Sequence, residues 1–347
     1  MQLSIFAEEQ RLNKISKLGD TLEKLNEIIN WLVFIPILNA AIPREKSEKG
    51  GRPPYDSLLM FKVLVIKRLY NLSYDETEKQ MNDRLSFMRF LNLDINDNIP
   101  DAKTIHLYET LLSDSEAGKK LFDLFFEEID QKGYITRKGS IVDASFVEAP
   151  RRKNTKEQRE SLKNGKIPEE WEDPEHPQKL SQRDTDATWT KKGNNAYFGY
   201  KDNIKVDLDS KFIVDFNITV ASENDAEAAK GIFTKDDNAA YGDAAYPSLE
   251  LPNGVENMIN ENPKRNRPLT EEQRKSNQQK SKKRCRVEHV FAGMEQMLGG
   301  MTIRCKNQKR AGFEISMLNL LYNMRRLLSL INPTPNWLKR LARVTTV

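Results

Sequence analysis

Cysteine is scarce in this chain. Cys285 and Cys305 are the only two among 347 residues, which is too few for a disulfide scaffold or a cysteine-rich zinc site. They are typical of free thiols in a reducing compartment. No segment combines a basic start, an apolar run and a small-residue cleavage site, so secretion is not expected.

Long apolar runs are also lacking. The longest, near residues 29–42, is interrupted by Asn30, Pro36 and Asn39 and is too short to span a bilayer. We therefore expect a cytoplasmic protein with no membrane segment. The chain is long enough for two domains, and its 38% hydrophobic residues are enough to build a core.

The chain also lacks a strong net charge, because its 55 basic residues nearly balance its 51 acidic residues. The distribution along the chain is more informative than this sum. Residues 263–310 contain 14 Lys or Arg and four acidic residues. Such a local excess suits contacts with phosphate groups, although a solvated helix face has the same composition.

The pattern of apolar residues predicts a helical first part of the chain, over residues 1–135. Apolar residues recur at helical spacing over 22–34, 57–69, 101–112 and 116–129. Ser73, with Glu76 three residues later, is a capping-box signal for a further helix. Short helices joined by tight turns fit a helix-turn-helix DNA-binding unit and a dimerisation bundle equally well.

The pattern changes after residue 135. Strands are predicted at 140–145, 197–207, 212–220 and 239–243, and helices at 225–233, 270–298 and 313–330. This order predicts an α/β domain over 136–330 with a mixed sheet covered by helices, followed by a tail at 331–347. Residues 150–192 are polar and rich in Lys, Glu, Gln and Pro, so we expect a mobile insertion there.

Two predicted strands carry or end in an acidic residue. Asp143 follows Ile141 and Val142, and Asp243 ends the short strand at 239–243. A carboxylate in a buried strand is costly unless it is paired, hydrogen-bonded or bound to a metal. Either acid alone is more often a turn or helix cap, but two in one sheet favour a shared cation.

A third acidic residue, Glu288, lies on the predicted basic helix at the margin of an apolar stripe. It can lean toward the sheet, or form an ion pair with Arg284 one turn earlier. Three converging carboxylates would bind Mg²⁺ or Mn²⁺, since these cations prefer oxygen ligands. Two such ions could assist the attacking and the leaving oxygen of an in-line displacement.

Four stretches together resemble the insertion-sequence-five family of bacterial transposases, over residues 10–330. The first comprises residues 51–62 (GRPPYDSLLMFK) and 84–91 (RLSFMRFL), and the second is 142–150 (VDASFVEAP). The third is 186–193 (DATWTKKG) with 198–201 (FGYK), and the fourth is 267–273 (RPLTEEQ) with 286–291 (RVEHVF).

The resemblance implies an RNase H-like catalytic core with a D-D-E set of metal ligands. Asp143, Asp243 and Glu288 fall on the positions of the three carboxylates. The implied cofactor is Mg²⁺ or Mn²⁺, as two ions. Arg284 matches the Arg of the family's Y-R-E-K signature, which implies a contact with DNA phosphate, and Lys201 is a further candidate for such a contact.

The chain departs from the family pattern at two signature positions. The Tyr position falls on Ser281, and the Lys position falls on Glu295. An acid at this place weakens phosphate binding or shifts it to neighbouring cations. Those neighbours are Lys282, Lys283 and Arg286.

The second carboxylate has two competitors just upstream of Asp243. Asp236 and Asp237 precede the predicted strand, whereas Asp243 ends it. We therefore assign the second ligand position to Asp243.

The leading hypothesis is a bacterial transposase that cuts DNA at transposon ends and joins the ends to target DNA. Its partners would be the terminal inverted repeats, the target DNA and a second copy of the chain, in a homodimer on DNA at the bacterial nucleoid. One alternative is a catalytically silent DNA-binding protein descended from a transposase. Another is a nuclease that nicks DNA without joining it.

Overall fold

The computed structural model describes residues 7–42, 54–151, 154–246, 249–263 and 268–331. The chain forms two compact units, one from residues 1–112 with 319–347 and one from residues 113–318. The domains predicted from the sequence, 1–135, 136–330 and 331–347, have other boundaries than these two units, and they stay a prediction. The predicted tail lies outside the described residues, apart from Ile331.

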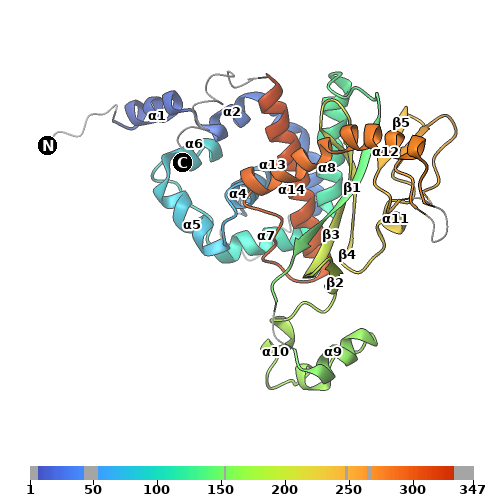
Figure 1. Ribbon diagram of the computed structural model, residues 1–347. Coiled ribbons are helices and arrows are strands. Elements are labelled where there is room, and N and C mark those ends of the chain that lie inside the picture. The colour runs from blue at the N-terminus through green and yellow to red at the C-terminus, as the bar shows by residue number, and fades with distance from the viewer. Residues whose placement is uncertain (1–6, 43–53, 152–153, 247–248, 264–267, 332–347) are drawn as a thin grey trace, which may run out of the picture. The chain divides into compact units, whose positions relative to one another are not determined.

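The first unit is helical, as predicted (Figure 1). Its elements are α1 (Ala7–Leu18), α2 (Thr21–Ile28), η1 (Trp31–Phe34), α3 (Ile35–Ala41), α4 (Ser57–Leu69), α5 (Tyr74–Asp83), α6 (Leu85–Leu91), most of α7 (Ala102–Asp114) and the last part of α14 (Gln308–Ile331). Ser73 accepts a hydrogen bond from the Glu76 N–H at the start of α5, so the predicted cap is confirmed.

Aromatic side chains form the core of the helical unit. The Trp31 ring packs edge-on against Phe90 and Phe61, with centroids 5.4 and 6.2 Å away. Phe34 packs against Phe61 at 5.2 Å. Edge-to-face pairs of this kind stabilise a core beyond their buried area, which explains how short helices hold together.

The second unit contains a six-stranded mixed sheet. Its strands are β1 (Ser140–Glu148), β2 (Thr188–Lys192), β3 (Asn195–Asp207), β4 (Ile213–Val220), β5 (Ala239–Gly242) and β6 (Glu256–Ile259). The order is β2-β3-β1-β5-β6, with β4 also paired to β3. Pairings with β3 are antiparallel, whereas β1, β5 and β6 run parallel. The predicted mixed sheet is confirmed, and so is the predicted hairpin, which β3 and β4 form.

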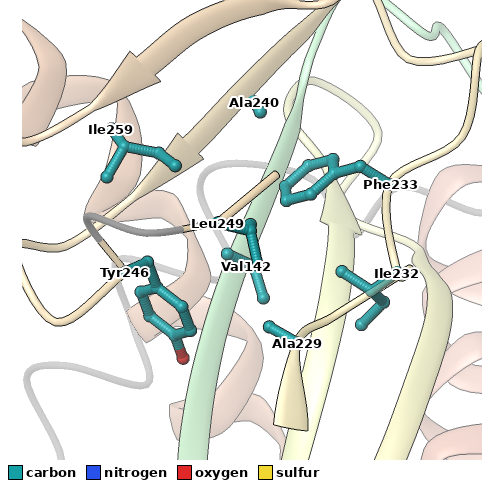
Figure 2. Close-up of a cluster of buried hydrophobic side chains, with 8 residues drawn as sticks. All are labelled: Val142, Ala229, Ile232, Phe233, Ala240, Tyr246, Leu249 and Ile259. Atoms are coloured by element: carbon teal, nitrogen blue, oxygen red, sulfur yellow. The ribbon is translucent and has the colours of Figure 1, made fainter. Parts of the chain in front are cut away.

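A buried apolar cluster packs on one side of β1 and β5 (Figure 2). Its members are Val142, Ala229, Ile232, Phe233, Ala240, Tyr246, Leu249 and Ile259. Successive side chains of a strand point to opposite faces, so Val142 faces this cluster while the next residue, Asp143, faces the other side.

A close approach between β1 and β3 requires a glycine. Gly199 has φ +150°, and a Cβ built there would lie 2.2 Å from the Val147 carbonyl oxygen. No side chain fits at that distance. The glycine of the FGYK stretch is thus explained by sheet geometry.

The helices of the second unit include α8 (Ala117–Gln131), α12 (Glu271–Arg284), α13 (Arg286–Met297) and the first part of α14. The single helix predicted for 270–298 is wrong, because it is interrupted at Cys285. The two parts differ in burial: α12 buries none of its side chains, whereas α13 buries Val287, Val290 and Met294. The predicted helix at 225–233 is limited to α11 (Asp225–Ala228).

The polar segment 150–192 contains α9 (Lys156–Lys163), η2 (Glu169–Trp171), α10 (Gln178–Ser181) and β2. Its end is attached to the sheet by buried Asp184, whose two carboxylate oxygens share the single Tyr200 O–H donor at 3.0 Å each. Asp186 accepts from the Gln308 N–H at 2.8 Å. Asp184 and Asp186 thus anchor this end of the segment, and the predicted mobility of residues 150–192 stays a prediction.

Within the described ranges, no helix is both long enough and apolar enough to cross a bilayer.

Candidate active site

Asp143 and Asp243 come from neighbouring parallel strands. The β1–β5 register pairs Ser140 with Ala240 and Ile141 with Tyr241. Continued by two residues, this register places Asp143 level with Asp243. A Cβ built on Gly242 would lie 3.4 Å from Val142 Cγ1, which agrees with strands that are still adjacent there.

The Asp143 carboxylate is largely shielded, with 20% of its side chain exposed. Oδ1 accepts a hydrogen bond from the Ala144 N–H at 2.9 Å, and Oδ2 accepts one from Arg284 Nη1 at 3.0 Å. Burial raises the pKa of the Asp143 carboxyl, and the negative charge of Asp243 raises it further. The Ala144 N–H and the positive charge of Arg284 act in the opposite direction.

Asp243 begins a tight turn directly after β5. Its Oδ1 accepts from the Ala245 N–H at 2.7 Å, and its carbonyl accepts from the Tyr246 N–H at 3.3 Å. The turn therefore fixes the carboxylate at the end of the strand, and it returns the Tyr246 ring to the apolar cluster.

Glu288 lies in the first turn of α13, a helix that packs against β1. Its side chain is 65% exposed, and Oε1 lies 3.6 Å from Arg284 Nη2. The ion pair considered for this residue is thus present.

The Arg284 guanidinium links two of the three carboxylates, because it contacts Asp143 and Glu288 through different nitrogens. Among the described residues, no three His, Cys, Asp or Glu side chains are gathered closely enough to hold a metal ion. The available donors nevertheless fit a hard divalent cation, since all three are carboxylates. Asp143 and Asp243 also repel each other, so a cation bound between the two carboxylates would be stabilising.

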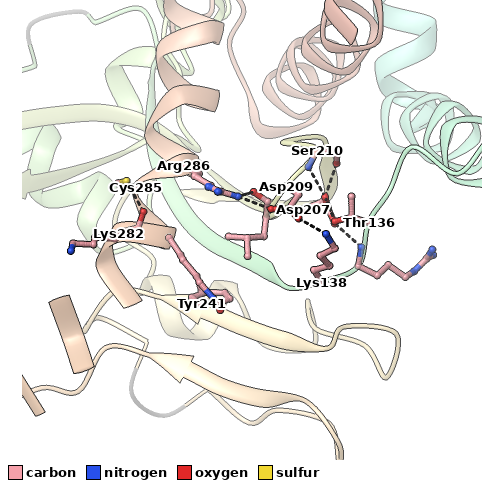
Figure 3. A network of polar contacts seen from close by, with 12 residues as sticks. Thr136, Lys138, Asp207, Asp209, Ser210, Tyr241, Lys282, Cys285 and Arg286 are labelled. Carbon is pink, nitrogen blue, oxygen red and sulfur yellow. Dashed lines mark hydrogen bonds and ion pairs between the residues drawn. The ribbon is translucent and has the colours of Figure 1, made fainter. Parts of the chain in front are cut away.

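Arg286, Lys282 and Lys283 lie around the junction of α12 and α13. Arg286 Nη1 donates to Asp209 Oδ1 at 2.7 Å and to the Leu208 carbonyl at 3.0 Å (Figure 3). This Arg286 side chain is 40% exposed, so it remains open to solvent.

Lys282 and Lys283 are both exposed, in the last turn of α12. Lys283 Nζ donates to the Tyr241 hydroxyl at 3.1 Å. Two exposed ammonium groups beside Arg286 make this junction a basic surface, which we call the junction surface (Lys282, Lys283 and Arg286).

Lys201 is placed differently from the other predicted DNA contacts. Its ammonium is nearly buried and donates to the Glu223 carbonyl and to Asp225 Oδ1, both at 2.6 Å. Contact with a DNA phosphate would require these bonds to break.

Asp237, a competitor for the second ligand position, precedes β5 and has a complete set of partners. Oδ1 accepts from the Ser140 hydroxyl at 2.6 Å. Oδ2 accepts from Lys205 Nζ at 3.2 Å and from the Thr234 N–H at 2.8 Å. These bonds occupy both oxygens, at the opposite end of β5 from Asp243.

The sequence alone did not predict a role for Tyr246, which the structure brings to the candidate active site. Tyr246 is 1% exposed, and its pKa is raised by burial and by the charges of Asp143, Asp225 and Asp243. Tyr246 follows Asp243 by three residues. This spacing could have indicated its position, because a tight turn after Asp243 brings such a residue back beside the end of the strand.

Two family models match the chain. One, described as Transposase DDE domain, matches residues 135–324, which is more than half of the chain. The other, described as Transposase domain (DUF772), matches residues 10–110. No solved structure matches the chain.

The first match agrees with the mixed sheet, so the predicted RNase H-like fold is confirmed. Assignment to the insertion-sequence-five family in particular stays a prediction. With a helical part and a sheet-containing part each matched by a transposase model, the chain belongs to the DDE transposases of the insertion-sequence type.

Proposed function

We propose that the protein cuts DNA at transposon ends and joins them to target DNA, using Asp143, Asp243 and Glu288 as metal ligands. One observation carries this proposal. The β1–β5 register supports it, because continuing the printed pairs by two residues brings Asp143 level with Asp243. The third acid, Glu288, shares the Arg284 guanidinium with Asp143.

The three carboxylates would hold Mg²⁺ or Mn²⁺, as two ions. Such ions, when bound, activate the attacking oxygen and stabilise the leaving oxygen of a phosphodiester displacement. Asp143 is well suited as a ligand because it lies within a strand and cannot move far. The raised pKa that burial gives it is lowered again by any cation that binds there.

The reaction consists of two displacements at the same site. In the first, water attacks the phosphorus at a transposon end, which leaves a 3′-hydroxyl on one side and a 5′-phosphate on the other. In the second, that 3′-hydroxyl attacks a phosphodiester of target DNA and releases a new 3′-hydroxyl. The first step breaks one phosphodiester bond. The second step breaks one phosphodiester bond and forms another, so the number of phosphodiester bonds stays constant.

DNA would be held by cations near the three acids. The junction surface offers Lys282, Lys283 and Arg286 to the phosphate backbone, and Arg284 can exchange a carboxylate for a phosphate oxygen. Lys201 would join them only after release from Asp225. The helical unit would recognise the terminal inverted repeats, in a homodimer at the bacterial nucleoid.

A test is the cleavage and joining of DNA that carries the element's own ends, with Mn²⁺. Asp143→Ala, Asp243→Ala and Glu288→Ala should each reduce joined products by about a thousandfold or more, while end binding survives. Glu227→Ala is the matched control, because within the described part of the chain Glu227 forms an ion pair only with Lys230, at the surface. It should cut and join like the wild type.

Two other outcomes would select the alternatives. End binding without any cleavage by the wild type would favour a silent DNA-binding protein. Glu295, exposed on α13, would then be the first residue to change to Lys. Nicked DNA that is never joined would instead favour a nuclease.

A further inference from the structure

Tyr246 has a buried hydroxyl group without a hydrogen-bond partner among the described residues. A buried polar group left unpaired costs about 1–3 kcal/mol, and native structures contain few such groups. Phenylalanine would fill the same space without this cost. The hydroxyl therefore calls for an explanation other than packing.

The position of the ring connects this hydroxyl with the candidate active site. The Tyr246 N–H donates to the Asp243 carbonyl at 3.3 Å, so the turn that holds one acid also holds the ring. The ring lies 3.3 Å from the point where a Cβ on Gly242 would stand. It belongs to the apolar cluster on the Val142 face of β1, opposite the Asp143 side chain, and it lies against Gly242, the last residue of β5.

Figure 2 shows how the ring lies in that cluster. Ile259 and Leu249 lie toward the base of the Tyr246 ring, and the oxygen is at the far end. The ring thus lies at the edge of the apolar cluster, and the hydroxyl points away from Ile259 and Leu249.

The charges around the hydroxyl keep it protonated. Burial raises the pKa of Tyr246, and the negative charges of Asp143, Asp225 and Asp243 raise it further, against a smaller opposing influence of Arg284. A neutral phenol donates one hydrogen bond and accepts others. Among the described residues, the group is therefore a donor without an acceptor.

We propose that Tyr246 is a positioning residue whose hydroxyl donates a hydrogen bond to an oxygen atom that enters the Asp143–Asp243 site at the end of β5. That oxygen belongs to a water molecule or to a DNA phosphate, and the hydroxyl fixes its place relative to the two acids. This inference rests on the proposed function in one respect, since it takes Asp143 and Asp243 as the cation ligands.

Tyr200 provides a matched contrast within the same sheet. It is also fully buried, but its hydroxyl donates to both oxygens of Asp184. Loss of the Tyr200 hydroxyl should lower the melting temperature, because buried Asp184 loses a partner. Loss of the Tyr246 hydroxyl should leave the melting temperature unchanged or raise it.

The first measurement is the thermal unfolding of the full chain in EDTA, for wild type, Tyr246→Phe and Tyr200→Phe. The expected result is a lowered Tm for Tyr200→Phe alone. A comparable loss of Tm in Tyr246→Phe would show that its hydroxyl has a structural partner, and would overturn the proposal.

The second measurement is Mn²⁺ affinity, from the electron paramagnetic resonance signal of free Mn²⁺, without DNA and with a duplex that carries the element's terminal sequence. Tyr246→Phe should weaken Mn²⁺ binding by about tenfold. Weakening without DNA identifies the oxygen as that of water, and weakening only with DNA identifies it as that of phosphate. Tyr200→Phe should retain wild-type affinity in both arms.

Asp143→Asn, measured in parallel, separates this inference from the proposed function. Should Asp143→Asn abolish Mn²⁺ binding while Tyr246→Phe changes it in neither arm, the role of Tyr246 is refuted and the metal site stands. Wild-type Mn²⁺ affinity in Asp143→Asn would refute the metal site itself, and the inference with it.

Discussion

The two ends of β5 each carry an acid beside β1, and they differ in how completely the acid is paired. At the first end, Asp237 accepts hydrogen bonds from Ser140, Lys205 and Thr234; we call these four residues the Asp237 network. At the other end, Asp143 and Asp243 repel each other, and Tyr246 has a hydroxyl without a partner among the described residues.

This difference separates a structural acid, Asp237, from the two acids that we propose as metal ligands. Buried charge is tolerated where protein groups satisfy it completely, as in the Asp237 network. Where two carboxylates repel each other and a buried hydroxyl has no acceptor, the folded state is less stable than it would be with these groups paired. Such unfavourable arrangements are typical of sites whose remaining partners come from a ligand.

The largest effect on stability should follow from breaking the Asp237 network. Lys205 and Asp237 are both almost fully buried and form an ion pair at 3.2 Å. Lys205→Met leaves the Asp237 carboxylate without its cation, which should lower the free energy of unfolding by about 3–5 kcal/mol. Urea denaturation measures this loss.

A double variant is the control for that loss. Lys205→Met combined with Asp237→Leu removes both charges, so it should be more stable than Lys205→Met alone. A Lys205→Met variant as stable as the wild type would mean that the two ends of β5 do not differ as described.

A smaller effect is expected from Arg284, the cation that occupies the incomplete end. In Arg284→Gln, Asp143 and Glu288 lose the guanidinium that competes with a metal ion. Mn²⁺ should therefore bind the DNA-free protein up to about tenfold more tightly, while DNA binding weakens and loses about one unit of salt dependence. Titration calorimetry measures the first effect and binding at several salt concentrations the second.

Arg286→Gln is the matched variant, since the Arg286 guanidinium donates to Asp209 and to the Leu208 carbonyl and to none of the three catalytic candidates. It should weaken DNA binding without changing the affinity for Mn²⁺. Weaker Mn²⁺ binding in Arg284→Gln would mean that the guanidinium supports the metal site and does not compete for it.

Much of this contrast could be predicted from local sequence. The strand with Asp143 and the strand end at Asp243 followed from apolar runs that stop at an acid, and the hairpin followed from alternation around a polar turn. These patterns depend on residues close together in the chain. The role of Asp143, Asp243 and Glu288 came from the resemblance, because spacing alone could not select three acids among 51.

Other features depend on contacts between distant residues. The break at Cys285 lies between α12, which buries none of its side chains, and α13, which packs on β1. The charged residues continue through the break, so the sequence pattern does not indicate it. The burial of Lys201 depends on Asp225 and Glu223, more than 20 residues away in the sequence. The Tyr246 hydroxyl has no hydrogen-bond acceptor among the described residues. This depends on which groups the fold brings near the hydroxyl, so no local sequence pattern predicts it.

The smallest effect concerns how stability depends on pH, and here the two kinds of acid should differ in sign. Burial raises the folded-state pKa of Asp143 above the ordinary value of 3.8, so the native state binds this proton more tightly than the unfolded state does. Stability then falls as pH rises from the ordinary value through the folded pKa. Asp143→Asn carries no such proton, and its stability relative to wild type should rise over that interval.

Asp209 should show the opposite trend, because the hydrogen bond from Arg286 holds the pKa of its carboxyl below 3.8. Its contribution is present above the ordinary value and is lost as pH falls through the folded pKa. Asp209→Asn should therefore lose stability relative to wild type as pH rises through that lower interval. Urea denaturation in EDTA from about pH 3 to pH 8 compares both variants with the wild type. Parallel curves for Asp143→Asn and wild type would show that its carboxylate is as well accommodated as a paired one, and the contrast between the two ends of β5 would then rest on Tyr246 alone.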